Sequence, residues 1–300
     1  MELVKENVTV NQVSCKGDTQ VLVDEDIIVP DVKPDILKIL QLDAVSCITN
    51  KEITNGRVNV TGRVDLKILY IPDSDREKIK SIITSFDFTQ NVTDDMTAII
   101  MANVDRAEFS LINSRKLRIK VIVGLDYEVV AEKNVEIAVE AEDCDNAELL
   151  KENVKLQNCI GLTETEFSVK ESIEVPNGQT SINEILKVDT KISDSEYKAV
   201  TGKIVVKGEI SVCVLYTDSD CCIQFMESEV PFTEIIDCDD AGDETMCDID
   251  YSISDVRYKV VEDDDGDNRI VDIDVEDIRS KLLALGGVKV KSEDQVNEIY

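Results

Sequence analysis

Cysteine is the residue type in this chain best suited to do chemistry. Nine cysteines occur among 300 residues, and none has the C-x-x-C spacing that is typical of a zinc ribbon or a thioredoxin-type motif. The spacing therefore supports neither of these two motifs. A metal site would have to draw on cysteines without any specific spacing, namely Cys213, Cys221, Cys222, Cys238 and Cys247.

Three of these cysteines are expected to be exposed. Cys213 falls on the polar side of an alternating segment, and Cys221 and Cys222 lie in the polar stretch 217–222. Two interpretations stay open. Free thiols can simply persist in a reducing cytosol, or exposed thiols can cross-link neighbouring molecules after release to an oxidising environment. Under the second interpretation, Cys213, Cys221 and Cys222 are the cross-linking candidates.

The acidic run at 262–268 is the second candidate for chemistry. Ca²⁺ prefers several carboxylate and amide oxygens from a loop in which glycine permits a sharp turn. The run lacks the closing glutamate of an EF-hand loop, and the alternative interpretation is an Asp-Gly hairpin turn. Apart from this Ca²⁺ candidate, the sequence predicts no cofactor. Its ligands would be Asp263, Asp265, Asp267 and Asn268.

The charge balance excludes whole classes of function. Asp and Glu number 63 and Lys and Arg 32, which gives a formal net charge of −31. A chain this acidic repels nucleic-acid phosphates and anionic membrane surfaces. Histidine is absent, so a histidine-dependent triad, an imidazole zinc site and a histidine general base are all excluded. Because phosphate-binding glycine motifs are missing as well, we do not expect an enzyme.

The segments that direct proteins to membranes or to export are not expected here. The chain starts without a cationic region followed by an apolar run, which predicts that it has no signal peptide. No apolar stretch approaches the roughly 20 residues that a membrane-spanning helix needs. We therefore expect neither membrane insertion nor signal-dependent export.

An internal repeat organises the chain and must position these residues. Residues 6–70 align with residues 152–216 without a gap, and 18 of the 65 aligned positions are identical. The repeat continues with small gaps, pairing 86–89 with 230–233 and 117–123 with 270–276. We expect two domains, 1–150 and 151–300. A third copy would begin near residue 298, so the chain holds two copies or is a piece of a longer array.

The apolar pattern predicts the fold class. Apolar residues alternate with polar ones from Val58 to Tyr70, and again from Ile204 to Tyr216. Such period-two alternation is typical of antiparallel strands with one buried face. We expect a mainly β protein of two tandem homologous β-sandwich or barrel-like domains. A few short helices are predicted as well, over 35–40, 181–186 and 274–285.

The most specific pattern lies within residues 20–40 and recurs in the second copy. Its centre is Val29-Pro30, and each copy later carries two glycines six positions apart and a Leu-Tyr pair at 69–70 or 215–216. This pattern resembles the SPOCS domain family of clostridial spore coat and exosporium proteins. The resemblance covers nearly the whole chain.

The resemblance implies a spore-envelope protein. Such a protein is made in the mother-cell cytoplasm without export and is deposited on the spore surface, in the coat or the exosporium. A coat morphogenetic member of the family ends in a LysM domain that recruits it, whereas no LysM pattern follows residue 290 here. The cysteine content is more similar to that of cysteine-rich, self-assembling exosporium proteins. Mother-cell lysis would expose the thiols to oxidant, which makes late cross-linking chemically reasonable.

From the repeat and the resemblance we expect a structural protein that self-assembles into a higher-order array. Its partners would be further copies of itself and other spore coat or exosporium proteins. Tandem copies present similar surfaces twice, and head-to-tail contacts between such surfaces can propagate into arrays or close into rings. Two alternatives stay open: a non-lattice adaptor that binds another coat morphogenetic protein, and a Ca²⁺-dependent surface-binding module that uses 262–268.

Overall fold

The computed structural model describes residues 2–74, 78–93, 98–142, 157–287, 289–291 and 296–298. These residues form strands and turns, and none of them belongs to a helix that would cross a membrane. The first half contains β1 (Glu2–Ile28), β2 (Ile36–Thr54), β3 (Arg57–Pro72), β4 (Lys80–Thr93), β5 (Ile99–Asn113) and β6 (Lys116–Glu142). The second half contains β7 (Gln157–Glu174), β8 (Glu184–Val200), β9 (Lys203–Thr217), β10 (Ile223–Asp237), β11 (Met246–Glu262) and β12 (Asn268–Gly287), followed by β13 (Lys289–Lys291) and β14 (Val296–Glu298).

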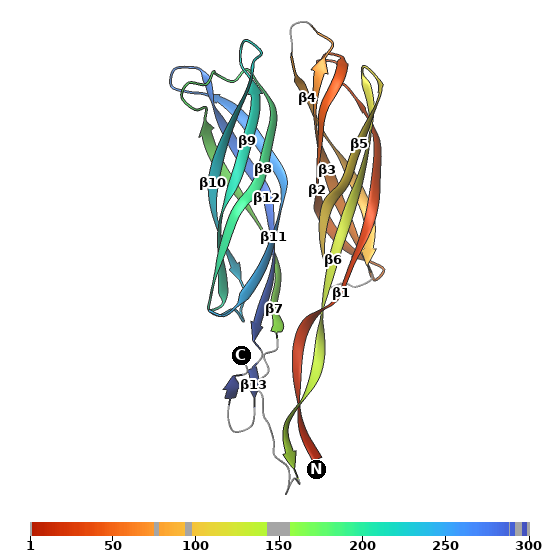
Figure 1. Ribbon diagram of the computed structural model, residues 1–300, viewed down its shortest axis with the longest axis vertical. Helices are drawn as coiled ribbons and strands as arrows, with labels where there is room; N and C mark the ends of the chain where they lie inside the picture. Colours follow the sequence, from red (N-terminus) through yellow and green to blue (C-terminus); the bar gives the residue numbers. More distant parts are fainter. Residues whose placement is uncertain are drawn as a thin grey trace.

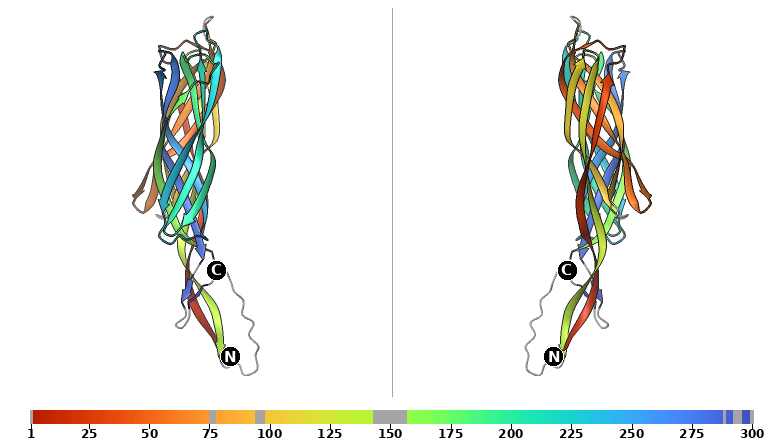
Figure 2. Two further views of the ribbon diagram at one scale, coloured as in Figure 1. Left: turned by 90° about the vertical axis from the view of Figure 1, so that its left-hand side faces the viewer. Right: turned by 90° about the vertical axis from the view of Figure 1, so that its right-hand side faces the viewer.

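Each half folds into two antiparallel three-stranded sheets packed face to face. The sheets of the first domain have the strand orders β1-β6-β5 and β2-β3-β4, and those of the second domain have the orders β7-β12-β11 and β8-β9-β10. Each strand of the second domain occupies the same place as its repeat equivalent in the first, so the two domains share one topology. The two elongated sandwiches lie side by side with their long axes nearly parallel (Figures 1 and 2). The expected mainly β fold with tandem domains is confirmed. The expected boundary at residue 150 lies outside the described residues.

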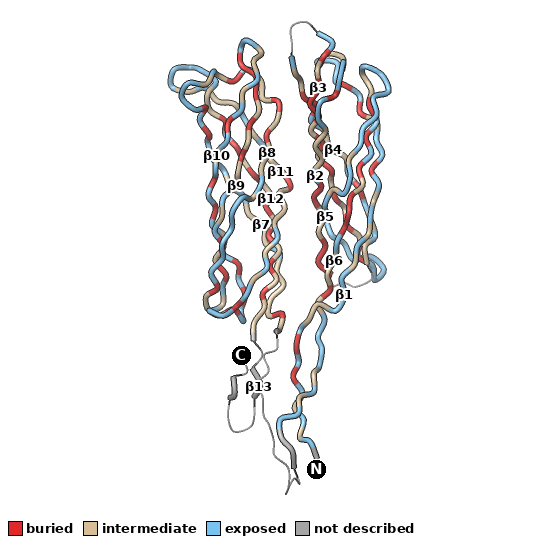
Figure 3. Tube along the Cα trace, in the orientation of Figure 1, coloured by how far each residue is buried: buried red, intermediate tan, exposed pale blue. Residues whose placement is uncertain are grey.

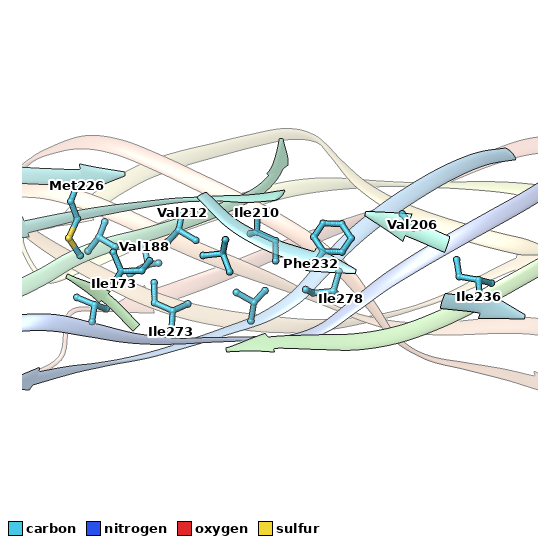
Figure 4. Packing of buried hydrophobic residues seen from close by; sticks show 14 of the residues in the cluster. Ile173, Val188, Val206, Ile210, Val212, Met226, Phe232, Ile236, Ile273 and Ile278 are labelled. Atoms are coloured by element: carbon cyan, nitrogen blue, oxygen red, sulfur yellow. The ribbon is translucent and has the colours of Figure 1, made fainter. Parts of the chain in front are cut away.

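Alternation along the strands builds one core in each domain. On β3, residues from Val58 to Tyr70 alternate between buried and partly exposed positions, as the sequence pattern predicts. Buried positions occur along the strands of both sheets in each domain (Figure 3), and their side chains form one core cluster per sandwich. Figure 4 shows this packing in the second domain, where Ile210, Phe232 and Ile278 come from three different strands. The two large cores share no residue, so each domain buries its own apolar surface.

Strands β1 and β6 continue beyond the first sandwich as a two-stranded ribbon (Figure 1). Val8 and Val10 are buried there and pack against Val135 and Ile137. This small satellite core is separate from the core of the sandwich.

The prediction of three short helices is wrong, because the structure forms strands and turns in these segments instead. Their apolar spacing comes from β-bulges. On β12, a bulge between Val275 and Ile278 shifts the buried positions from odd to even numbers. Buried residues then fall three and four apart at Val275, Ile278 and Leu282, which imitates one face of a helix. Bulges between Ile36 and Lys38 and between Ile185 and Lys187 produce the same effect at the other two segments.

The expected alignment of 117–123 with 270–276 is wrong by one residue. Ile27 pairs with Leu117 on β6, and its repeat equivalent Ile173 pairs with Val271 on β12. The counterpart of Leu117 is therefore Val271. In a strand, a shift of one residue exchanges the buried and the exposed face, and both Leu117 and Val271 are fully buried.

The repeated glycine in mid-strand is explained by a cross-strand aromatic ring. Gly62 pairs directly with Phe88, and Gly208 pairs directly with Phe232. The phenyl ring covers the glycine in each case, so a side chain at either position would collide with it. The expected pairing of 86–89 with 230–233 is thereby confirmed. The other repeated glycine, at 56 and 202, lies in a hairpin turn with positive φ.

Replacing Gly62 by alanine should destabilise the first domain by about 1–3 kcal/mol, the usual cost of overpacking. The new methyl group would collide with the Phe88 ring and would meet the Cys47 main-chain oxygen at 2.6 Å. Adding Phe88→Leu should recover only part of this loss, because the carbonyl contact persists. Gly56→Ala is the control for backbone strain alone, since its surroundings are open. Urea unfolding measures all three variants, and an unchanged midpoint for Gly62→Ala would contradict the assigned role.

Candidate functional site: the domain contact and the surface thiols

An arginine and a tyrosine hold the Val-Pro loop of the first domain. The guanidinium of Arg115 donates hydrogen bonds to the carbonyl oxygens of Val29 (3.0 Å) and Pro30 (3.1 Å). The buried Tyr70 donates its hydroxyl proton to the Pro34 oxygen at 3.1 Å. The Leu-Tyr pair at the end of β3 therefore anchors the loop that carries the repeat motif.

The second domain holds its loop in the same way. Arg269 donates to the oxygens of Val175 (3.0 Å) and Pro176 (3.2 Å), and the Tyr216 hydroxyl donates to the Thr180 oxygen (3.1 Å). The repeat motif is thus a structural unit that closes one end of each sandwich. Sequence reasoning missed both arginines. The one-residue error in the alignment of this region separated them.

The two domains meet through the edges of their sheets. A three-stranded sheet leaves unpaired main-chain carbonyl groups along its outer strands. At the contact, cationic side chains of each domain donate to carbonyl oxygens on edge strands of the other. Two of these bonds run from β3 to β8 and β11, and one runs from β12 to β2. The pairs are Lys67 with Val188, Arg63 with Ser254, and Arg279 with Ile48.

Ion pairs reinforce this contact. Lys187 lies between Asp43 of the other domain and Asp189 of its own strand, with its ammonium nitrogen 2.6 Å from the Asp189 carboxylate. Only 11% of the Lys187 side chain is exposed. Burial alone would lower the pKa of Lys187, but the hydrogen bonds to Asp189 and Asp43 outweigh burial and raise the pKa. Two further pairs cross the contact, Lys80 with Glu184 at 2.6 Å and Lys67 with Asp189 at 3.1 Å.

A cavity of about 390 Å³ lies along the same contact. It is lined from both domains, by residues that include Ser46, Tyr251 and Arg279. The hydroxyl group of Ser46 is buried and has no hydrogen-bond partner among the described residues. Because the two apolar cores are separate and this contact is polar, the domains are joined mainly by hydrogen bonds and charge.

The domain contact is not repeated on the second domain. The repeat equivalents of Arg63 and Lys67 are Glu209 and Cys213. Neither replacement is cationic, so the second domain lacks the donors with which the first domain caps the edges of its neighbour. The same contact therefore does not extend from the second domain to a further copy.

Cys213 occupies the outer face of β9, as predicted, but it is partly covered. It lies in register with Asp189 on β8 and Glu227 on β10. Burial, with added repulsion from the Glu227 and Asp189 carboxylates, raises the pKa of the Cys213 thiol. A raised pKa leaves less thiolate at neutral pH, so the Cys213 thiol reacts more slowly with oxidants than a thiol of ordinary pKa.

Cys221 and Cys222 form the turn that leads into β10. Cys221 has a φ of 56°, and the amide of Cys222 donates to the Asp218 carboxylate at 2.8 Å. The ammonium group of Lys78, from the first domain, lies 3.8 Å from the Cys222 sulfur. Both thiols are partly exposed. The structure thus brings all three predicted cysteines onto the β8-β9-β10 sheet and its adjoining turn.

Strand β10 combines an open edge with exposed apolar side chains. Among the described strands its sheet partner is β9 alone. Ile223 and Phe225, which directly follow the two turn cysteines, are 43% and 58% exposed, and Ile235 is exposed as well. An open strand edge with apolar residues is a surface that favours association with another chain.

The acidic run forms the hairpin turn between β11 and β12. The Asp263 carboxylate accepts hydrogen bonds from the amides of Asp265 (3.0 Å) and Asp267 (2.9 Å), and Gly266 adopts a φ of 84°. Asp263 also lies 3.8 Å from the guanidinium of Arg269. Asn268 begins β12, and its main-chain oxygen accepts the amide of Ile182. Within the described parts of the chain, no three His, Cys, Asp or Glu side chains are grouped so as to hold a metal ion.

The remaining cysteines differ in exposure. Cys15 is exposed on β1, whereas Cys47 is buried at the domain contact. Cys159 and Cys238 are buried in the second domain, and Cys247 is partly covered. Cys144 lies outside the described residues.

The fold and its surfaces define a duplicated β-sandwich protein, and comparison with known proteins supplies the family. The family model described as SipL, SPOCS domain, matches residues 35–112 and 181–261. These segments make up more than half of the chain, which therefore belongs to the SPOCS domain family. No curated protein and no solved structure matches the chain. Membership of this family gives the chain a role connected with sporulation and the spore coat.

The folded domain is larger than the matched segment. The two matches contain strands β2–β4 and β8–β10 in full, and all but the last residue of β5 and β11. Strand β6, which is the middle strand of its sheet, lies outside the match, and so does its counterpart β12. Each matched segment therefore needs flanking strands to complete its second sheet.

Replacing Lys187 by methionine should lower the free energy of unfolding by about 1–2 kcal/mol, between the values for exposed and buried pairs. The change leaves Asp43 and Asp189 close together without their shared cation. Lys191→Met, at an exposed position of the same strand, is the matched control and should have little effect. Urea unfolding gives the energies, and amide hydrogen exchange on β2 and β8 locates the loss. Equal stabilities of the two variants would contradict the role of Lys187.

Acid should weaken the domain contact through Asp43. Burial acts to raise the pKa of Asp43, but hydrogen bonds from Lys187 and Gln41 outweigh it and hold the pKa below its usual value of 3.8. The stabilisation is therefore complete above about pH 4 and is lost as the pH falls through the lowered pKa. Asp43→Asn should remove this part of the acid dependence. The free energy of unfolding, measured from pH 6 to pH 2 for the original chain and for Asp43→Asn, tests this. The same pH dependence in both proteins would argue against it.

Proposed function

We propose that the chain is a structural protein of the spore envelope that self-associates into a higher-order array on the spore surface. Its family membership supports the spore role. The observation that carries self-association is the adjacency of two features on β10. The exposed apolar edge at Ile223 and Phe225 directly follows the turn thiols Cys221 and Cys222.

This arrangement supports association in two stages. Apolar side chains and an open strand edge would first bring a second copy against β10. Thiols beside that contact would then lie close to the neighbouring chain, where oxidation joins them. Burial and the raised pKa would slow the reaction of Cys213 in this step. Synthesis in the reducing mother-cell cytoplasm keeps these thiols free until the mother cell lyses.

The net charge sets a condition on assembly. At −31 the chains repel one another at low ionic strength. Salt or divalent cations screen this repulsion, so they should promote assembly. Suppression of assembly by added cations would count against this part of the proposal.

One observation favours a second candidate function, an adaptor that binds another spore coat protein without forming an array. The cations Arg63 and Lys67, which make the contact between the two domains, are replaced by Glu209 and Cys213 in the second domain. The internal contact is therefore not available for stacking further copies. An adaptor would stay monomeric or dimeric until its partner arrives.

Electron microscopy of the purified full chain, with and without reductant, separates the two candidates. We expect ordered sheets, rings or fibres, and ladders on non-reducing gels that collapse on reduction. The combined variant Cys213→Ser, Cys221→Ser and Cys222→Ser should keep the particles but lose the ladder. Cys15→Ser, which removes an exposed thiol of the first domain, should keep both.

A second variant separates the contact from the cross-link. Phe225→Lys should raise the protein concentration needed for assembly by about tenfold, because it places a charge in an apolar contact. Ile53→Lys, at a comparably exposed apolar position on β2, should leave that concentration unchanged. Isolated single chains under all conditions would contradict self-association, and a pull-down from sporulating cells would then search for the partner of an adaptor.

A further inference from the structure

The outer faces of two homologous sheets carry charges of opposite order. On the β1-β6-β5 sheet, Lys120 of the middle strand pairs with Asp24 on one side and with Glu108 on the other. On the β7-β12-β11 sheet, a carboxylate of the middle strand pairs with a cation on each side. The three residues of this second row are Lys170, Asp274 and Arg257. The two rows occupy equivalent places in the repeat, so the sign of the charge is inverted on all three strands.

The inversion continues along the middle strands. Cations alternate along the outer face of β6, whereas carboxylates alternate along the outer face of β12. We define the β6 patch as Asp24, Asp26, Glu108, Lys116, Arg118 and Lys120, and the β12 patch as Lys170, Arg257, Lys259, Asp272, Asp274 and Glu276. Residues 116–120 contain no carboxylate, and residues 272–276 contain no cation. In a chain with a formal net charge of −31, the cationic stripe on β6 is a local exception.

Both patches are open to solvent. The side chain of Lys120 is 51% exposed, and those of Lys170 and Arg257 are 71% and 65% exposed. The β12 patch lies at the end of its sheet that carries the Val-Pro loop. The first domain covers the same sheet farther along, where Arg279 donates to the Ile48 oxygen. A groove of about 590 Å³ runs over the β12 patch, so side chains of a facing surface can enter it.

The stability of each sheet does not account for the inversion. Within the β6 patch, the Arg118 guanidinium lies 2.9 Å from the Asp26 carboxylate, and within the β12 patch the Arg257 guanidinium lies 2.9 Å from the Glu276 carboxylate. Cross-strand ion pairs stabilise a sheet equally well in either order of sign. Exposed pairs also contribute little free energy. The opposite order of the two patches therefore matters only when one patch faces the other.

We propose that the β6 patch of one copy of the chain docks on the β12 patch of a second copy. When the two sheets face each other with their middle strands aligned, the cations of β6 meet the carboxylates of β12. The flanking carboxylates of the first patch then meet the flanking cations of the second. The match holds for either relative strand direction, because each pattern is symmetric about its middle strand. A patch does not match itself, since two β6 patches would set cation against cation.

A contact between two unlike patches is heterologous. Each copy carries one patch on each domain, so it can bind two neighbours and extend into an array or close into a ring. This contact rests on the self-association proposed above, but it uses neither the edge of β10 nor the surface thiols. Variants can therefore test the two contacts separately.

The test uses the full chain with reductant, in about 0.15 M salt, where a Debye length of about 8 Å screens the repulsion between distant charges. Lys120→Glu and Asp274→Lys should each raise the concentration for half-association, measured by sedimentation velocity, by about tenfold, because each sets like charges against each other. Asp274→Lys also makes the chain less acidic, which by itself favours association. A chain with both changes should recover most of the loss. Lys191→Glu, at an exposed position of β8, is the control for net charge and should have no effect.

Chemical cross-linking of the original chain gives a second measurement that does not depend on how the variants fold. A carbodiimide activates a carboxylate, and a lysine amine then displaces the urea to form an amide bond. In a mixture of isotopically light and heavy chains, we expect Lys120 to be linked to Asp272 or Asp274 of a different chain. Linkage of Lys120 to Asp24 within one chain, across a separation of 3.4 Å, is the internal control.

Three results would overturn the proposal. One is that the internal linkage forms without any linkage between the two patches. Another is that Phe225→Lys weakens association while Lys120→Glu and Asp274→Lys leave it unchanged, in which case self-association through β10 stands and the contact between patches is wrong. The third is that no chain associates at any concentration, which would contradict the proposed function as well.

Discussion

The main-chain carbonyl groups at the sheet edges are the constraint on which the arrangement of the two domains depends. Sheets of only three strands have two edges each, and four such sheets leave many carbonyl oxygens without a strand partner. The chain satisfies part of these with cations from the other domain, through Arg63, Lys67 and Arg279. The same bonds fix how the sandwiches lie against each other and block three edge strands against pairing with foreign chains. Strand β10 lacks such a cover, which is why association is assigned there.

Much of the fold follows from the sequence, because strand periodicity and a gapless repeat are local features. Alternation predicts β3 and β9, and the repeat predicts that both halves share one topology. The errors have one cause. A β-bulge adds a residue to one strand and shifts its buried face, so the buried residues Val275, Ile278 and Leu282 imitate a helix. Bulge positions depend on the facing strand, which a single sequence does not display. The misplaced equivalent of Leu117 shows the same limit, because gaps in a repeat hide a shift of one residue.

Of the candidate site, the sequence predicted only which cysteine positions lie at the surface. Polar neighbours correctly indicated that Cys221 and Cys222 lie in a surface turn, and that Cys213 faces outward. Burial, together with carboxylates on two other strands, raises the pKa of the Cys213 thiol, and the sequence alone displays neither cause. The cations of the domain contact are unlike their repeat equivalents, as Lys67 is unlike Cys213. This difference was visible in the alignment, and it is the signal that would have pointed to the contact.

Each sandwich is built from six strands, and an even number of antiparallel strands returns the chain to the end at which it entered. β6 finishes and β7 begins at the same end (Figure 1). Consecutive domains therefore lie side by side in the same orientation. Their Val-Pro loops, at Val29 and Val175, lie at one end, and their hairpin turns, at Gly56 and Gly202, lie at the other. A layer made by setting such domains in rows has two chemically different sides. In an array of the proposed kind, duplication of this fold would therefore distinguish an inner from an outer side.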